Sequence, residues 1–371
     1  MKGRKGRLGI MVTERDRTPP FSNQHFYRRL CLIGNRHGLI VFVFPSERID
    51  WASGTVIGYT VRHPREGWIK KRFPLPDLIY DRCFFTGRRE YLAFRSQIRK
   101  LRRMSRITFL GHGLPGKWRV NEMLAGDEEL APYLPPMEKA ENAAVVREWL
   151  NEHGEVFLKP QGGSQGRGAM RIGTRDEGRH RYVVSGRDDL NRVFRYGFTD
   201  FERLGRWLGL IFRRRNYVMQ PYLQLSTPDG EPCDIRSFVQ KNKHGRWQLI
   251  GTALRVGRRG ALTSNLHGGG RAEETLPFLT RHYGESAAGI IERIHSLTLR
   301  AAETLESRHG RLVELGVDFG VDRAGRIWIL EVNSKPGRTV FARISDRAAS
   351  RLSLVNPIHY ARYLWDRQLG G

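Results

Sequence analysis

Short apolar runs alternate with amphipathic segments along most of the chain, and this pattern predicts a mixed α/β protein. The N-terminal part predicts strands at 8–12, 39–44 and 78–81, a helix between the first two, a hairpin over 55–73 and a basic helix over 91–104. Glycine and proline interrupt the pattern between Gly111 and Pro115. We therefore expect a first α/β domain over residues 1–112.

The rest of the chain predicts two more units that combine strands with helices. The first of these contains a helix at 143–152, two strands around a glycine-rich loop over 156–172, a helix at 200–212 and an apolar strand at 217–223. Pro221 cannot donate to a central ladder, so this last strand suits an inter-domain hinge. Strands at 232–239 and 246–256, a long amphipathic helix at 287–308 and a basic helical tail follow. We expect the two units at 113–222 and 223–371.

A β-hairpin is predicted near the C-terminal end, with strands at 316–321 and 326–333 around an Asp322–Gly325 turn. Alternation places Asp318, Glu331 and Asn333 on one face. The other face is then apolar and consists of Val317, Phe319, Val321, Trp328, Leu330 and Val332. Two carboxylates and an amide are hard oxygen ligands of the kind that suits Mg²⁺. A merely solvated polar face is the alternative.

A lysine stands at the end of a strand and is followed by a glycine-rich loop. Lys159 precedes Gly163, Ser164, Gly166 and Gly168. Glycines let backbone N–H groups approach a phosphate closely, and the lysine adds a point charge. The loop is not a Walker A motif, because GxxxxGK[ST] is absent and no helix is predicted after it. The pattern indicates phosphate contact, with a flexible turn as the alternative.

Composition indicates a soluble globular protein with an acidic partner. The chain has 371 residues, is 39% hydrophobic and shows neither a long apolar run nor a signal-peptide pattern, so we expect no membrane span and a cytoplasmic location. Three scattered cysteines predict neither disulfides nor a zinc site. The net charge of +26 suggests nucleic acid, an anionic polymer or an anionic membrane or spore surface as partner. Basic clusters at 99–103 and 213–215 carry no nucleic-acid motif, so solvated faces are the simpler interpretation.

Several motifs occur in one order that resembles the ATP-grasp superfamily, most closely its glutathione-synthetase-like and ribosomal-protein-glutamylase-like branch. They are Lys117, the loop after Lys159, Gln220-Pro-Tyr-Leu223, Asp234-Ile-Arg236, Asn265 with Gly268-Gly269, and Asp318 with Glu331-Val-Asn333. The resemblance covers roughly residues 113–340. Asn333-Ser-Lys-Pro-Gly337, Gly116-Lys-Trp118 and Tyr80-Asp-Arg82 look like the YheC/YheD endospore-coat-associated family.

This resemblance implies an ATP-grasp fold after an N-terminal α/β pre-ATP-grasp domain, with a lid subdomain at 113–222 and a C-terminal subdomain at 223–371. It implies the following roles: Lys117 and Lys159 on ATP phosphates under a lid formed by 163–168; Gln220, Tyr222 and Leu223 at adenine; Asp234 near the ribose; Arg236, Arg255 and Asn265 in catalysis; Asp318, Glu331 and Asn333 on one or two Mg²⁺ ions, with Mn²⁺ as a substitute. Alternatives without a role in catalysis or binding stay open for three residues. Arg236 is one of 53 arginines, Asn265 suits a turn, and Lys335 suits either an acidic substrate or solvent.

The implied activity is that of an ATP- and Mg²⁺-dependent carboxylate–amine or carboxylate–thiol ligase that acts through an acyl-phosphate. Its carboxylate and amine substrates are not named by the sequence, although the charge favours an acidic peptide, an anionic polymer or a spore-surface component. A non-catalytic ATP-binding spore-coat protein and a basic nucleic-acid-binding protein are the alternatives. The sequence does not decide the oligomeric state.

Overall fold

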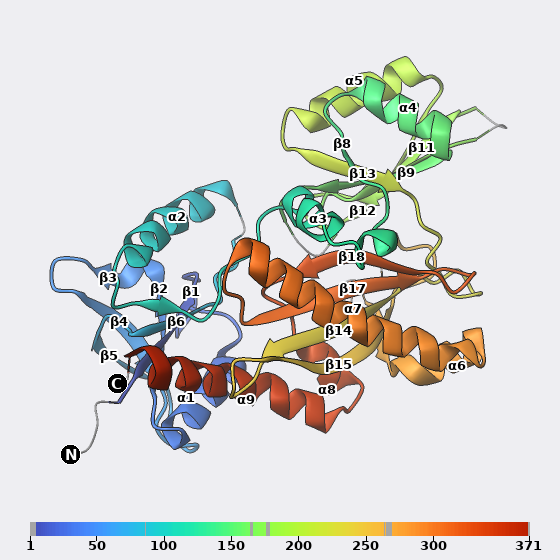
Figure 1. Cartoon of the computed structure of the whole chain (residues 1–371). Coiled ribbons are helices and arrows are strands. Elements are labelled where there is room, and N and C mark those ends of the chain that lie inside the picture. The colour runs from blue at the N-terminus through green and yellow to red at the C-terminus, as the bar shows by residue number, and fades with distance from the viewer. Residues whose placement is uncertain are drawn as a thin grey trace.

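The computed structural model describes residues 5–85, 87–163, 166–175, 179–262, 264 and 269–369, and these build three β-sheets with helices against them (Figure 1). Both helices and strands are abundant, which confirms the α/β class. The three sheets follow one another along the chain. The domain limits at 112 and 222 stay a prediction.

The N-terminal sheet is mixed, with strand order β3-β4-β2-β1-β6-β7 and β5 paired to β4; β2, β1, β6 and β7 run parallel, and β3, β4 and β5 form antiparallel pairs. The predicted strand–helix–strand start is confirmed, since β1 pairs in parallel with β2 and β6. The predicted hairpin is β4 with β5. The elements are β1 (Arg7–Val12), α1 (Gln24–Arg36), β2 (Ile40–Pro45), η1 (Ser46–Arg48), β3 (Ile49–Asp50), β4 (Thr55–Thr60), β5 (Ile69–Pro74), β6 (Leu78–Asp81), α2 (Arg88–Arg102) and β7 (Thr108–Phe109).

The second sheet is antiparallel, with order β12-β11-β10-β9-β13-β8, and α4 and α5 share its core. The 217–223 segment forms β13 between β9 and β8, but Pro221 pairs only with Val156 of β9, because β8 reaches only Val218 and Met219. Proline is thus placed where no ladder needs its missing N–H. The elements are α3 (Lys117–Ala125), η2 (Ala131–Tyr133), β8 (Glu138–Lys139), α4 (Ala143–His153), β9 (Glu155–Pro160), β10 (Met170–Thr174), β11 (Tyr182–Arg187), β12 (Val193–Phe198), α5 (Phe201–Phe212) and β13 (Tyr217–Pro221).

The third sheet has order β16-β15-β14-β17-β18 and lies between two helical layers (Figure 1). Helices α6 and α7 pack on one face around Ile294 and Leu297, whereas Phe341 and Ala349 of α8 and α9 cover Phe238 on the other. The elements are β14 (Cys233–Lys241), β15 (Trp247–Val256), β16 (Arg271–Glu273), α6 (Thr275–Tyr283), α7 (Ser286–His309), β17 (Glu314–Val321), β18 (Ile327–Asn333), α8 (Thr339–Arg343), α9 (Arg347–Leu364) and η4 (Trp365–Leu369).

The predicted hairpin is β17 with β18, and a β-bulge changes its apolar face. Asp318 pairs with Glu331 but the next residue, Phe319, pairs with Ile329, so Leu330 is the extra residue. The expectation that Trp328 and Leu330 share the core face was therefore wrong. Ile327 and Ile329 join the core instead. Simple alternation fails beyond the bulge because one added residue exchanges the two faces.

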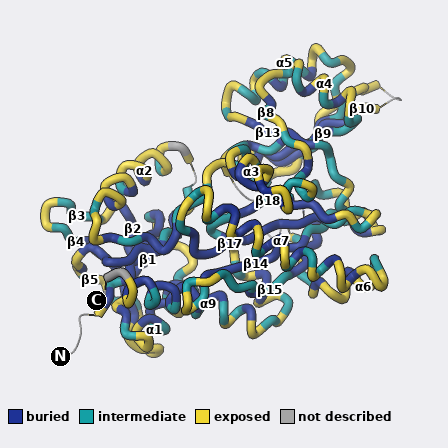
Figure 2. The backbone as a smooth tube through the Cα atoms, viewed as in Figure 1, coloured by how far each residue is buried: buried dark blue, intermediate teal, exposed yellow. Residues whose placement is uncertain are grey.

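Buried contacts join parts of the chain that are distant in sequence. Helix α9 places Ile358, Ala361 and Leu364 in the same core as Leu8 and Val41 of the N-terminal sheet. Figure 2 shows continuous burial from β1 and β2 to the sheet of β14 and β17. The C-terminal helix thus belongs to two packing units at once.

Candidate active site

The first residue of α3 links the glycine-rich loop to the hairpin. The Lys117 backbone N–H donates to the Gln161 carbonyl at 3.0 Å. Its ammonium donates to the Gly163 carbonyl at 3.2 Å and lies 3.5 Å from a Glu331 carboxylate oxygen. Lys117 therefore brings a positive charge to the point where the loop after β9 meets β18.

Lys159 approaches the same face of the hairpin from β9. Its Nζ donates to the Leu330 carbonyl at 3.4 Å. Lost hydration lowers the pKa of Lys159 to about 8, while the carboxylates of Glu331 and Asp318 oppose that shift and the charge of Lys117 adds to it. Burial makes the charged form of Lys159 unfavourable, and among the described residues its ammonium donates only to the Leu330 carbonyl. An anionic ligand would stabilise this ammonium.

Two arginines and two aspartates form a buried network across β14, β15 and β17. The register pairs Arg236 with Asp318 and Asp234 with Arg255. Arg236 binds both carboxylate oxygens of Asp318, with Nη2–Oδ2 at 3.0 Å. Arg255 bridges the two acids, with Nη2 at 3.0 Å from Asp318 Oδ2 and Nε at 2.5 Å from Asp234 Oδ1. Ser264 also donates to Asp234.

The charge state of Asp318 follows from this network. Burial raises the pKa of Asp318, but the Arg236 and Arg255 guanidinium groups together outweigh burial and hold it below its ordinary value. Asp318 is therefore a carboxylate at neutral pH. Its Oδ2 is contacted by both arginines, whereas among the described residues Oδ1 accepts only from Arg236 and keeps a second lone pair for another ligand.

The hairpin offers a small set of oxygen donors that fits Mg²⁺. Asp318 and Glu331 pair directly across β17 and β18, and Asn333 follows two residues later opposite Gly316. In the described part of the chain no three His, Cys, Asp or Glu residues gather as a metal cage. Two carboxylates and one amide nevertheless suit an ion that keeps several waters and shares phosphate oxygens.

The segment after β13 supplies a buried acceptor without a partner. The Gln220 side chain is buried, and its Oε1 accepts no hydrogen bond from any residue that the structure describes. The Tyr222 N–H donates to the Glu155 carbonyl at 3.1 Å, and the Arg171 guanidinium lies 4.1 Å from the Tyr222 ring centroid. Leu223 follows directly, between the second and third sheets. A buried acceptor without a partner is stabilised by a hydrogen-bond donor, such as the amino group of a nucleobase.

The glycine-rich loop has the backbone that only glycine adopts readily. Gly163, Gly166 and Gly168 have φ of 102°, 71° and 74°. At Gly168 an added Cβ would also lie 2.9 Å from the Pro160 ring. Ser164 is outside the described residues.

The third proposed catalytic residue, Asn265, and its neighbour Gly268 also lie outside the described residues. The structure therefore brings together Lys117, Lys159, Asp234, Arg236, Arg255, Asp318 and Glu331, with Asn333 at the end of the same strand. The Gln220–Leu223 segment lies at the junction of the two sheets.

Sequence reasoning missed a buried carboxylate that supports this site. Glu314 accepts from Tyr80 OH at 2.7 Å, Arg82 Nη1 at 2.6 Å and Gln240 Nε2 at 3.0 Å, and it pairs with Arg338. The only local signal is a glutamate inside the apolar run Leu312-Val-Glu-Leu-Gly-Val317. A buried charge in such a run requires partners, although the sequence does not name them.

Lys335 makes contacts that the sequence did not indicate. Its ammonium lies 2.8 Å from Asp81 and donates to the Cys83 carbonyl at 3.0 Å. It therefore connects the loop after Asn333 to the end of β6, rather than lying free in solvent.

No helix in the described part of the chain combines the length and the hydropathy that a membrane crossing requires.

Comparison with known proteins agrees with this architecture. The chain is 30% identical over 303 residues to the endospore coat-associated protein YheC of Bacillus subtilis (strain 168), covering 81% of each protein. It is 27% identical over 357 residues to YheD of the same strain, covering 94% of this chain and 76% of YheD. The crystal structure of D-cycloserine synthetase DcsG covers 97% of this chain and 99% of its own, with TM-score 0.57 and 14% identity, which shows a shared fold. A YheC/D-like ATP-grasp family profile matches residues 106–364, and the chain belongs to this family.

Proposed function

We propose that the protein is an ATP- and Mg²⁺-dependent ligase that joins a carboxylate to an amine through an acyl-phosphate. The observation that carries the proposal is the meeting of two lysines, two arginines and two carboxylates on one face of the third sheet. This arrangement suits phosphoryl transfer, in which catalysis is mainly positioning and charge neutralisation.

The two lysines are proposed to bind the phosphates of ATP. Lys117 lies at the glycine-rich loop and Lys159 at the bulge of β18, so the two ammonium groups flank Glu331. Gln220, Tyr222 and Leu223 would hold the adenine, and Asp234 the ribose. The loop at 163–168 would close over the phosphates.

Asp318, Glu331 and Asn333 are proposed to hold one or two Mg²⁺ ions, with Mn²⁺ as a substitute. When bound, Mg²⁺ would offset the phosphate charge that repels a carboxylate nucleophile. Glu331 is the more accessible acid, because its side chain is 27% exposed and its only ion pair among the described residues is with Lys117. Asp318 is held in place by its arginines.

The arginines are proposed to stabilise the transferring phosphoryl group. Arg236 contacts Asp318 through Nε and Nη2, and Arg255 contacts the acids through the same two atoms. In both, no hydrogen bond from Nη1 to a described residue is present, so this group can donate to an oxyanion. Asn265 is the third proposed catalytic residue.

The substrates are proposed to be an acidic peptide or spore-surface component and an amine, with a thiol as the alternative nucleophile. The strongly basic chain favours an acidic substrate. YheC and YheD are named for the endospore coat, so we propose that the substrate is a component of the coat. We propose that the protein acts on it in the cytoplasm.

The test is release of ADP from ATP and Mg²⁺ in the presence of amino acids or acidic peptides. We expect turnover that depends on both substrates and falls by about 10²-fold or more in Glu331→Gln, because a ligand to the phosphate-bridging metal is lost. Glu129→Gln, which removes an exposed acid paired with Arg293, is the matched control.

Two results would contradict the proposal. ATP binding with no ADP release for any substrate, in both the parent and Glu331→Gln, would favour a non-catalytic ATP-binding coat protein. Sequence-independent DNA binding without protection by ATP in a melting assay would favour a nucleic-acid-binding protein.

A further inference from the structure

Helix α2 concentrates positive charge that the candidate active site does not use. Residues 88–106 hold eight arginines and lysines and one glutamate, a net charge of 8 − 1 = +7. These 19 of 371 residues thus account for more than a quarter of the chain's +26. So much charge on one element requires either solvent or an anionic partner.

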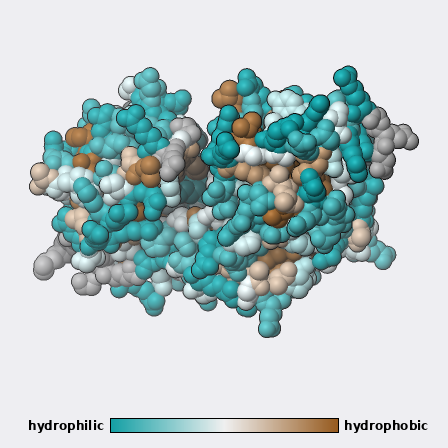
Figure 3. All heavy atoms as spheres, turned by 90° about the horizontal axis from the view of Figure 1, so that it is seen from above, coloured by the Kyte–Doolittle hydropathy of each residue, from teal (hydrophilic) through white to brown (hydrophobic). Residues whose placement is uncertain are grey.

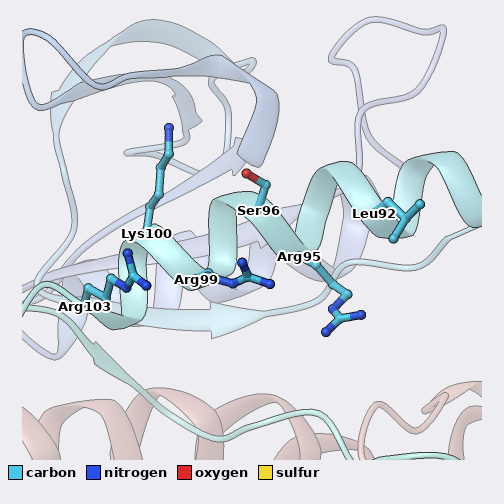
Figure 4. Close-up of a pocket in the computed structure, with 6 residues that line it drawn as sticks. All are labelled: Leu92, Arg95, Ser96, Arg99, Lys100 and Arg103. Carbon is cyan, nitrogen blue, oxygen red and sulfur yellow. The ribbon is translucent and has the colours of Figure 1, made fainter.

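Three of these arginines form a row on the exposed side of the helix. Phe94, Ile98 and Leu101 are buried in the N-terminal core. Arg95, Arg99 and Arg103, which we call the α2 stripe, follow at four-residue spacing on the outer side (Figure 4). The stripe lines a shallow depression with Leu92, Ser96 and Lys100.

The α2 stripe has no acidic partner among the described residues, unlike some exposed arginines of other helices. Within the described chain no carboxylate lies within 4.0 Å of its three guanidinium groups, and Glu90 of the same helix pairs with Arg15. By contrast, Arg203 pairs with Asp200, Arg206 with Glu202 and Arg362 with Asp366. Arg347 and Arg351 of α9 also have no carboxylate partner among the described residues, so the stripe is distinguished by its local excess of positive charge and not by missing partners alone.

The inner side of α2 lies near the loop that follows the candidate metal-binding strand. Phe94 lies in the first half of α2, and the Lys335 ammonium is 5.6 Å from its ring centroid. Lys335 stands two residues after Asn333 and bonds to Asp81 at the end of β6. From above, the molecule is hollowed between its two lobes, and the edge of the hollow on the right-hand lobe is mostly hydrophilic (Figure 3). Because Phe94 is on the buried side of α2 and the stripe on its outer side, an extended chain bound at the candidate site would pass around the first turns of the helix to reach the stripe.

We propose that the α2 stripe binds an acidic polypeptide whose reactive end occupies the candidate active site. Guanidinium groups one helical turn apart lie about 6 Å apart along the axis. In an extended chain, every second side chain recurs at about 6.6 Å, so alternate carboxylates match the stripe. Each pair can form two parallel hydrogen bonds.

The features of the stripe favour a polypeptide over a nucleic acid. Leu92 is 50% exposed and offers an apolar contact that a phosphate backbone cannot use. Helix α2 exposes one aromatic ring, that of Tyr91 beside Arg95, whereas sites for single-stranded nucleic acid stack successive bases on several rings. This proposal rests on the proposed ligase function, because that function explains why an acidic polypeptide would bind on this face.

The test measures binding to the full chain without ATP or Mg²⁺, so that it does not depend on turnover. A short labelled peptide of alternating Glu and Ala is titrated by fluorescence anisotropy at low salt, beside the same peptide with Gln in place of Glu. We expect the Arg95→Gln, Arg99→Gln, Arg103→Gln triple variant to bind the Glu peptide at least about tenfold more weakly, since three exposed ion pairs are lost. Nucleotide protection in a melting assay is expected to be unchanged.

The matched control is the Arg203→Gln, Arg206→Gln, Arg362→Gln triple variant, which removes the same charge from carboxylate-paired sites. Its affinity is expected to stay within about twofold of the parent. The proposal is overturned by an equal loss in both triples, by equal binding of the Gln peptide, or by tighter binding of single-stranded DNA or phosphatidylserine vesicles. If peptide binding behaves as expected while no substrate elicits ADP release, the proposed ligase function is wrong, but the α2 stripe is still a binding surface for acidic polypeptides.

Discussion

At the scale of single residues, Lys159 shows how the fold prepares a position for an anion. Its neighbour Leu158 lies in the core of the second sheet, and alternation along β9 directs the lysine toward β18. There its pKa falls to about 8, because lost hydration outweighs the nearby acids. The folded protein thus holds a cation that a phosphate would stabilise.

We predict that ATP binding takes up a proton when the pH is above about 8. The pKa of free Lys159 is about 8, so a large fraction is neutral at pH 8.5, and bound phosphates would raise the pKa and restore the charge. Below pH 7 the lysine is already charged, and uptake should vanish. Calorimetry in two buffers of different ionisation enthalpy measures the number of protons.

Lys159→Arg is the control, because a guanidinium stays charged throughout this range. It should bind ATP without the pH-dependent proton uptake. Uptake that persists unchanged in Lys159→Arg would show that another group titrates.

At the scale of elements, strand β17 carries both the supporting and the candidate active-site carboxylate. Glu314 and Asp318 are four residues apart and therefore face the same side of the strand. Glu314 joins β17 to Tyr80 and Arg82 at β6 and to Arg338 before α8. The strand is thus fixed to the N-terminal sheet at one end and serves the candidate site at the other.

We predict that Glu314→Gln lowers the free energy of unfolding by about 3–5 kcal/mol, because Arg82 and Arg338 would keep buried charges without a counter-charge. Burial raises the pKa of Glu314, but Arg338 and Arg82 outweigh it and leave the pKa lowered. The carboxylate therefore contributes stability fully above its unfolded pKa of about 4.3 and loses it as pH falls through the folded value. Urea unfolding at several pH values measures both effects.

The acid side of the stability profile should be flatter in Glu314→Gln than in the parent. Glu303→Gln, on the outer side of α7, is the matched control and should change stability by less than about 0.5 kcal/mol. Equal stability of Glu314→Gln and the control would contradict a supporting role for the buried network.

The elements that the sequence predicts well are those with local signals. The hairpin turn at Asp322–Gly325 and the long helix α7 follow from residue type and periodicity alone. The bulge at Leu330 was not predictable, because it depends on how β18 meets β17 and not on the sequence of either strand. The Glu314 network was missed for a related reason, since its partners are up to 234 residues away. Strands β11 and β12 were missed because they are short and partly exposed.

At the scale of the whole molecule, the last long helix completes the first core. Helix α9 packs against α1 and against β14, so it joins the N-terminal and third sheets. Ile358 is fully buried beside Gly34, where an added Cβ would lie 2.1 Å from Val41 and 3.8 Å from Ile358. Sequence periodicity showed a helical tail but gave no indication of which sheet it would cover.

We predict that Ile358→Ala destabilises the N-terminal sheet, although the change lies near the end of the chain. Loss of a fully buried isoleucine costs about 2–5 kcal/mol where the cavity cannot collapse. Hydrogen exchange of the β1 and β2 amides should therefore accelerate. Leu279→Ala in α6 is the matched control, because Leu279 is also fully buried but belongs to the core of the third sheet. It should accelerate exchange in β14 and β15 instead. Unchanged exchange of β1 and β2 in Ile358→Ala would mean that the first core is stable without α9, and the joining of the two sheets by this helix would then be incidental.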